Sequence, residues 1–96
     1  MIVKMPKLSK AEKILAILDY RDPCRVRGTS SWYLLYYNYE AEELAQTVRR
    51  NSNPSSVGKR VKELIDRKLE MEGREYRVDS ENAERVAETI ISDISH

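Results

Sequence analysis

The residues best suited to chemistry are cations in the middle of the chain. From Gln46 to Lys62 there is no acid, and the run holds five cations: Arg49, Arg50, Lys59, Arg60 and Lys62. Two serines, Ser55 and Ser56, lie among them, and hydroxyl, ammonium and guanidinium donors suit phosphate oxygens and base edges. Because binding depends on such a local patch rather than on the total charge of +1, the pattern indicates a nucleic-acid interface. The alternative is a solvated helix face, although such faces usually mix both signs.

Catalytic chemistry is poorly represented in the sequence. His96 is the single histidine and is the terminal residue, and no phosphate-cradling glycine loop or paired acid set accompanies the cations. Cys24 is the single cysteine, which excludes an intrachain disulfide and a cysteine-rich zinc site. We expect Cys24 to be a half-buried structural thiol, with an intermolecular disulfide as the alternative. The sequence thus predicts no enzyme, no cofactor and no metal.

Two helices separated by a turn carry the basic run. The first extends from Glu40 to about Arg50, with Asn38 as its cap and four apolar residues on one face: Ala41, Leu44, Ala45 and Val48. The second covers residues 54–69, with Asn53 as the cap and Pro54 in the first position. Its buried stripe is Val57, Val61, Leu64, Ile65 and Leu69. Gly58 on its flank allows close approach of another backbone, either the preceding helix or a partner.

A short β-hairpin is predicted after the second helix. The segments 69–72 and 76–79 alternate apolar and polar residues, and Gly73-Arg74 lies between them. Two short strands about a glycine-containing turn have this pattern.

The order helix, turn, helix and charged hairpin resembles the winged helix-turn-helix DNA-binding domain. The resemblance covers roughly Ser9 to Val78 and is carried by Glu43-Leu44-Ala45, residues 55–64 and the Gly73-Arg74 hairpin. It implies that the second helix enters the major groove and that the hairpin, called the wing, touches the backbone or minor groove. Three sets of contacts follow: Ser55, Ser56, Lys59 and Arg60 on the bases, Arg49, Arg50 and Lys62 on phosphates, and Arg74 and Arg77 on the wing.

Two further helices flank this unit. The first, from Ser9 to Tyr20, begins with a capping box of Ser9 and Glu12. The last runs from Ser80, as its cap, to Ile94, and its apolar residues at 83, 87, 90 and 94 have coiled-coil spacing. Such an apolar helix must be buried, and we expect a homodimer contact formed by Val86, Ile90, Ile91 and Ile94. The alternative is that this helix closes the core of its own chain beside Ile14 and Leu18.

The stretch from Thr29 to Tyr39 is ambiguous. Its aromatic run suits a strand, but Thr29-Ser30-Ser31 ahead of it suits a helix start, and helix is the slightly favoured interpretation. The rings are expected in the core or at an interface, with a base-stacking platform as the less favoured alternative. The predicted fold is therefore mainly α with a small β-hairpin (α+β), in one domain: an arm at 1–8, a winged-helix core at 9–79 and a C-terminal helix at 80–96.

These features together predict a sequence-specific double-stranded DNA-binding protein, most simply a transcription regulator acting as a homodimer. The alternative is a winged-helix module for protein–protein contact in a larger assembly. No membrane span or signal peptide is recognisable, so a cytoplasmic location is expected, or the host cytoplasm if the protein is viral. Charged residues make up 34% of the chain and Gln46 is its single glutamine, which favours a thermophile. The resemblance suggests a small free-standing regulator of archaeal or viral type.

Overall fold

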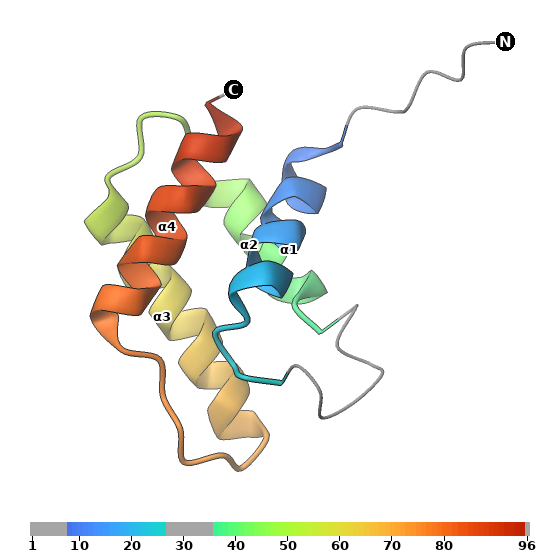
Figure 1. Ribbon diagram of the computed structural model, residues 1–96, viewed down its shortest axis with the longest axis vertical. Helices are drawn as coiled ribbons and strands as arrows, with labels where there is room; N and C mark the ends of the chain where they lie inside the picture. The colour runs from blue at the N-terminus through green and yellow to red at the C-terminus, as the bar shows by residue number, and fades with distance from the viewer. Residues whose placement is uncertain (1–7, 27–35, 96) are drawn as a thin grey trace, which may run out of the picture.

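The computed structural model describes residues 8–26 and 36–95 of the chain (Figure 1). Within these ranges the chain forms four helices. They are α1 (Lys10–Arg21), α2 (Asn38–Thr47), α3 (Pro54–Met71) and α4 (Ser80–Ile94). In these two ranges all regular secondary structure is helical. The predicted α+β class is therefore wrong, because the β-hairpin is not formed.

Local capping explains most of the helix boundaries. At α1 the Ser9 hydroxyl accepts a hydrogen bond from the Glu12 amide, and the Glu12 carboxylate accepts one from the Ser9 amide, both at 3.1 Å. At α3 the Asn53 side chain accepts from the amides of Ser55 and Ser56, and Pro54 is the first helical residue. These two caps confirm the sequence prediction, because each depends on neighbouring residues alone.

The starts of α2 and α4 differ from the prediction, and α2 ends at Thr47 rather than near Arg50. The first residue of α2 is Asn38 itself, preceded by Tyr37, whose side chain makes no capping bond. At α4 the cap is Asp79, which accepts from the Asn82 amide at 2.7 Å, so that Ser80 is already helical. Asp79 and Ser80 are both residue types that cap helices, and the carboxylate of Asp79 is favoured at the positive end of the helix.

The helices enclose one core, in which α4 packs on α3 and α1, and α1 also packs on α2. Gly58 allows α3 and α4 to approach closely, since a Cβ added there would lie 3.0 Å from the Glu84 Cα. The neighbour of Gly58 is thus the last helix, and not the preceding helix or a separate partner. By contrast, α2 and α3 touch over only a short stretch.

The predicted wing is replaced by a helix end and an irregular connection. Helix α3 continues to Met71, because Leu69 extends the buried stripe and is 0% exposed. Gly73 then adopts a left-handed φ of 70°, its amide bonds the Glu70 carbonyl, and the Arg74 amide bonds the Leu69 carbonyl at 3.0 Å. This is the Schellman ending of a helix. A glycine with positive φ serves a hairpin turn equally well, which is why the sequence pattern misled.

Residues 74–79 cross back to α4 without pairing as a strand. The fully buried Val78 anchors this connection, its amide donating to the Asp66 carboxylate at 3.0 Å and its carbonyl accepting from the Lys62 ammonium at 2.5 Å. Side chains of α3 thus satisfy backbone groups that a neighbouring strand would satisfy in a hairpin.

The four residues predicted as a dimer contact have different environments. Val86 and Ile90 are 0% exposed inside the single chain, whereas Ile91 and Ile94 are half-buried at the edge of the core. Val86 and Ile90 therefore belong to the core of the single chain, which also contains Ile14 and Leu18. The homodimer itself stays a prediction.

Several sequence predictions fall on residues outside the described ranges. They are the arm up to residue 7, most of the ambiguous stretch, whose residues 29–35 are not described, and His96. Of that stretch, Tyr36 and Tyr37 form a turn and Asn38 and Tyr39 open α2. Among the helices that the structure does describe, none combines the length and apolarity needed to cross a membrane.

Candidate nucleic-acid interface

The N-terminal half of α3 presents a polar face to solvent. Because Val57 and Val61 turn into the core, Ser55, Ser56 and Lys59 project on the opposite side and are exposed. The Lys59 side chain makes no hydrogen bond or ion pair to another described residue. This part of the predicted interface therefore has free donors.

Two other cations of α3 are neutralised within the chain. Arg60 pairs with Glu43 of α2 and with Glu63, each at 3.4 Å. Lys62 pairs with Asp66 at 2.8 Å, in addition to its bond to the Val78 carbonyl. The basic run from Gln46 to Lys62 contains no acid, but acids just before and after it in the sequence contact two of its cations in the structure. These contacts leave Arg60 and Lys62 less available to DNA than their residue types suggest.

Arg49 and Arg50 lie in the turn between α2 and α3, next to two lysines of α1. Together with Asn51 and Ile94 they line an open hollow of about 550 Å³, whose basic residues are Lys10, Lys13, Arg49 and Arg50. We call this the basic hollow. Figure 1 shows why these segments meet: the start of α1, the end of α4 and the α2–α3 turn all lie at the same end of the molecule.

The basic hollow disfavours the protonated form of the Lys10 side chain. Partial burial, and secondly the nearby Arg49, lower the pKa of the Lys10 ammonium. Lys10 and Arg49 both donate to the Val48 carbonyl, and Arg49 also reaches the Gln46 carbonyl at 3.2 Å. These bonds satisfy carbonyls at the C-terminal end of α2. The proximity of Lys10 and Lys13 to the turn was not predicted, because sequence periodicity gives no distance between separate helices.

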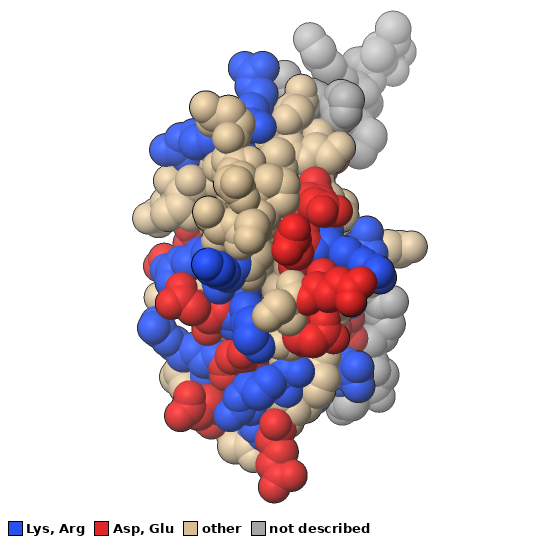
Figure 2. Space-filling view, turned by 90° about the vertical axis from the view of Figure 1, so that its left-hand side faces the viewer, with Lys and Arg blue, Asp and Glu red and all other residues tan. Residues whose placement is uncertain are grey.

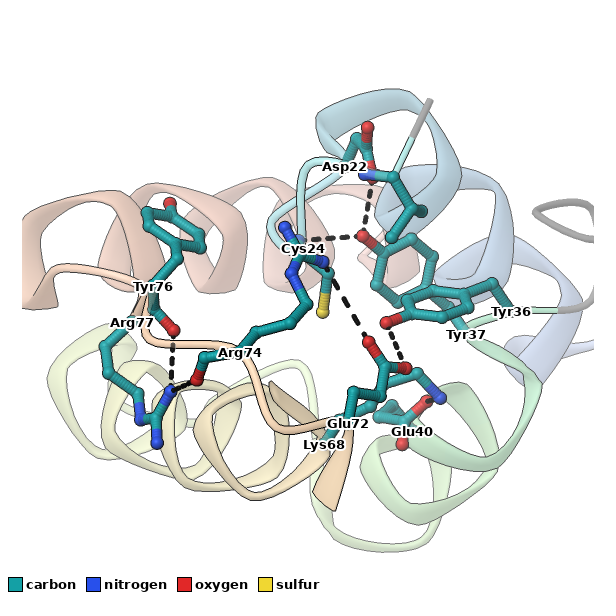
Figure 3. A network of polar contacts seen from close by, with 11 residues as sticks. Asp22, Cys24, Tyr36, Tyr37, Glu40, Lys68, Glu72, Arg74, Tyr76 and Arg77 are labelled. Atoms are coloured by element: carbon teal, nitrogen blue, oxygen red, sulfur yellow. Dashed lines mark hydrogen bonds and ion pairs between the residues drawn. The ribbon is translucent and has the colours of Figure 1, made fainter. Parts of the chain in front are cut away.

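Arg74 and Arg77 are held in a polar network rather than on a wing (Figure 3). Arg74 lies 3.9 Å from the Glu72 carboxylate, and Arg77 donates to the backbone carbonyls of Arg74 and Tyr76. The wing that was predicted to carry Arg74 and Arg77 is not formed, and their contacts lie within the connection after α3.

The same network joins the segment after α1 to α2 and α3. The buried Tyr37 hydroxyl donates to the Asp22 carboxylate at 2.7 Å and accepts from the Cys24 amide at 2.9 Å (Figure 3). Cys24 is 0% exposed, more deeply buried than expected, and this burial raises the pKa of its thiol to about 11. A buried thiol with such a pKa is unreactive, which supports the structural role predicted for it.

The charge of the surface is local rather than uniform. On the face shown in Figure 2, basic and acidic side chains alternate over the lower part, while the upper part is mostly uncharged with basic side chains at its margin. On this face basic side chains are therefore interspersed with acidic ones and form no continuous basic surface. Among residues 8–26 and 36–95, no cluster of His, Cys, Asp and Glu has the makings of a metal site.

Comparison with known proteins adds no family to this picture. No protein-family model matches the chain, and searches of curated proteins and of solved structures found no match. The candidate interface consequently depends on the arrangement of its own residues.

Proposed function

We propose that this protein binds double-stranded DNA through the unit formed by α2, the turn and α3, without a wing. The observation that carries the proposal is the exposed, unpaired face of Ser55, Ser56 and Lys59 at the start of α3. Serine hydroxyls and a lysine ammonium are donors that suit base edges and phosphates. Arg49 and Arg50 in the preceding turn supply phosphate contacts beside it.

The dimensions of α3 are compatible with a recognition helix. Its 18 residues correspond to about 27 Å, and a helix about 10–12 Å across fits the major groove, which is about 12 Å wide. The start of α3 follows an exposed turn, which leaves Ser55, Ser56 and Lys59 accessible to a duplex. The proposal therefore assigns base contacts to residues 55–59 and not to Arg60, whose guanidinium holds Glu43. Action as a homodimeric transcription regulator is part of the same proposal.

Replacement of Lys59 by Ala tests the proposal. We expect the affinity for a selected duplex to fall by about 1–3 kcal/mol if Lys59 contacts a base edge. If it contacts phosphate instead, affinity falls for all duplexes alike and the slope of log K against log salt decreases by about 1. Thermal stability is expected to stay unchanged, because Lys59 contributes nothing to the buried stripe.

Arg67 provides a matched control on the same helix. It is also exposed and free of ion pairs, but it follows Lys59 by about two helical turns. Arg67→Ala removes the same charge and is expected to leave duplex binding nearly intact. Equal losses from both variants, or full binding by Lys59→Ala, would exclude the start of α3 as the contact.

A protein-contact module is the second candidate function. An open groove of about 610 Å³ lies between α2 and α3, and two of its lining residues, Tyr39 and Met71, are 58% and 82% exposed. Large exposed apolar side chains of this kind mark interaction surfaces. Random duplex DNA at low salt discriminates the two functions, since a protein-contact module is expected to show no salt-sensitive binding.

A further inference from the structure

The basic hollow brings together four cations, and none of its lining residues within the described ranges carries a carboxylate. Lys10 and Lys13 project from the first turns of α1, and Arg49 and Arg50 come from the turn after α2. Glu12, the nearest acid in sequence, is tied to Ser9 in the capping box. Asp93 lines a neighbouring hollow with Lys13, but it forms no ion pair with that lysine. Within residues 8–26 and 36–95, the positive charge of the Lys13 and Arg50 side chains therefore has no acidic partner.

Only two of the four cations cap the C-terminal end of α2. Lys10 and Arg49 donate to carbonyls at the end of α2, as cations at a helix C-terminus usually do. The side chains of Lys13 and Arg50 make no hydrogen bond or ion pair with any described residue. They place two further positive charges in the hollow that holds Lys10 and Arg49, where burial, and secondly Arg49, lower the pKa of Lys10. A bound anion would offset these charges.

The donors in the basic hollow select the type of anion. Guanidinium groups bind phosphate oxygens in a bidentate fashion, and lysine ammonium groups bind them as point charges. Asn51 adds an amide donor, and Ile94 supplies the one apolar lining residue. A volume of about 550 Å³ has room for more than a single phosphate.

We infer that the basic hollow is a binding site for linked phosphate groups, held by Lys13 and Arg50 and supported by Lys10 and Arg49. Two sources share this chemistry: adjacent phosphates of a nucleic-acid backbone, and a small polyphosphorylated molecule. The site shares Arg49 and Arg50 with the proposed function and adds Lys10 and Lys13 to them. It does not depend on DNA binding, because it does not include the face of Ser55, Ser56 and Lys59.

Titration followed by amide NMR tests the site, with sodium tripolyphosphate as one probe and duplex DNA as the other. We expect tripolyphosphate to give saturable shifts at Lys10, Lys13 and residues 49–51. The double variant Lys13→Gln, Arg50→Gln is expected to weaken this binding at least about tenfold, since each lost cation removes charge-assisted hydrogen bonds. The control variant Arg67→Gln, Arg85→Gln removes the same charge at two exposed positions outside both proposed sites and should bind tripolyphosphate as before.

The two probes together identify the source of the phosphates. Competition of duplex DNA with tripolyphosphate at the same residues supports a backbone site, whereas duplex shifts restricted to residues 55–59 support a small phosphorylated ligand. If duplex DNA does not bind at all, the proposed function fails while the tripolyphosphate result still stands. The inference is overturned if sulfate at equal ionic strength gives the same shifts, if both double variants lose binding equally, or if tripolyphosphate produces no saturable shift.

Discussion

Tyr37 connects parts of the chain that are distant in sequence. Its ring is 1% exposed, and its hydroxyl is the acceptor for the Cys24 amide as well as a donor to Asp22. The aromatic composition of this stretch predicts burial, but nothing in the sequence indicates a partner so far along the chain. The contact depends on the left-handed backbone of Asp22, with φ of 47°, which turns the chain back after α1.

Tyr37→Phe is expected to reduce the free energy of unfolding by about 1–3 kcal/mol, the cost of leaving a buried donor unsatisfied. Urea unfolding measures this change, with Tyr39→Phe as the control, because Tyr39 is 58% exposed. A loss equal to that of the control would show that water takes over the Cys24 amide.

The cations Lys59 and Arg60 show which properties of the candidate interface the sequence pattern predicts. Helical periodicity predicts that Lys59 and Arg60 lie outside the buried stripe, and Lys59 is indeed exposed. It does not predict that Glu43 of α2 comes within 3.4 Å of Arg60. Exposure follows from local spacing, whereas pairing follows from how two helices cross, and the crossing is a tertiary property. The candidate interface could therefore be predicted in outline, but its free members could not.

At the scale of elements, the predictions succeeded where the determinants are adjacent in sequence. The capping box of α1 and the Asn53-Pro54 start of α3 involve residues within three positions of one another. The hairpin failed because alternation over four residues is too short to discriminate a strand from a helix end. Leu69 shows this, since it satisfies both the alternating pattern and the helical stripe.

Gly73→Ala tests the helix ending. Its φ of 70° is disfavoured for residues with a side chain, while no atom lies within 4 Å of the added Cβ. The expected loss of stability is thus conformational alone, about 1 kcal/mol, and Gly73→Asn is expected to lose less. Thermal or urea unfolding gives both values, with Glu75→Ala as an exposed control. Carbon chemical shifts at Leu69 to Met71 should be helical, and strand-type shifts there would contradict the ending.

For the whole molecule, α4 is the element whose partner the sequence left open. Its apolar positions predict burial, and both a second chain and the chain's own core would satisfy them. The structure buries Val86 and Ile90 against α1 and α3, and leaves Ile91 and Ile94 at the edge. A pattern of hydrophobicity thus gives the amount of surface to be buried, but not what buries it.

A homodimer contact through α4 can therefore use Ile91 and Ile94, but it can use Val86 and Ile90 only if the fold changes. We expect Ile91→Glu to separate such a dimer into chains of 11.2 kDa that remain helical, because a half-buried position tolerates a charge by turning it to water. Val86→Glu should instead unfold the chain, since it places an unpaired charge at a position with 0% exposure. Sedimentation at micromolar concentration, combined with circular dichroism, separates these effects. An unmodified protein that sediments at 11.2 kDa would eliminate the dimer, and DNA binding by that single chain would then predict a target site without two-fold symmetry.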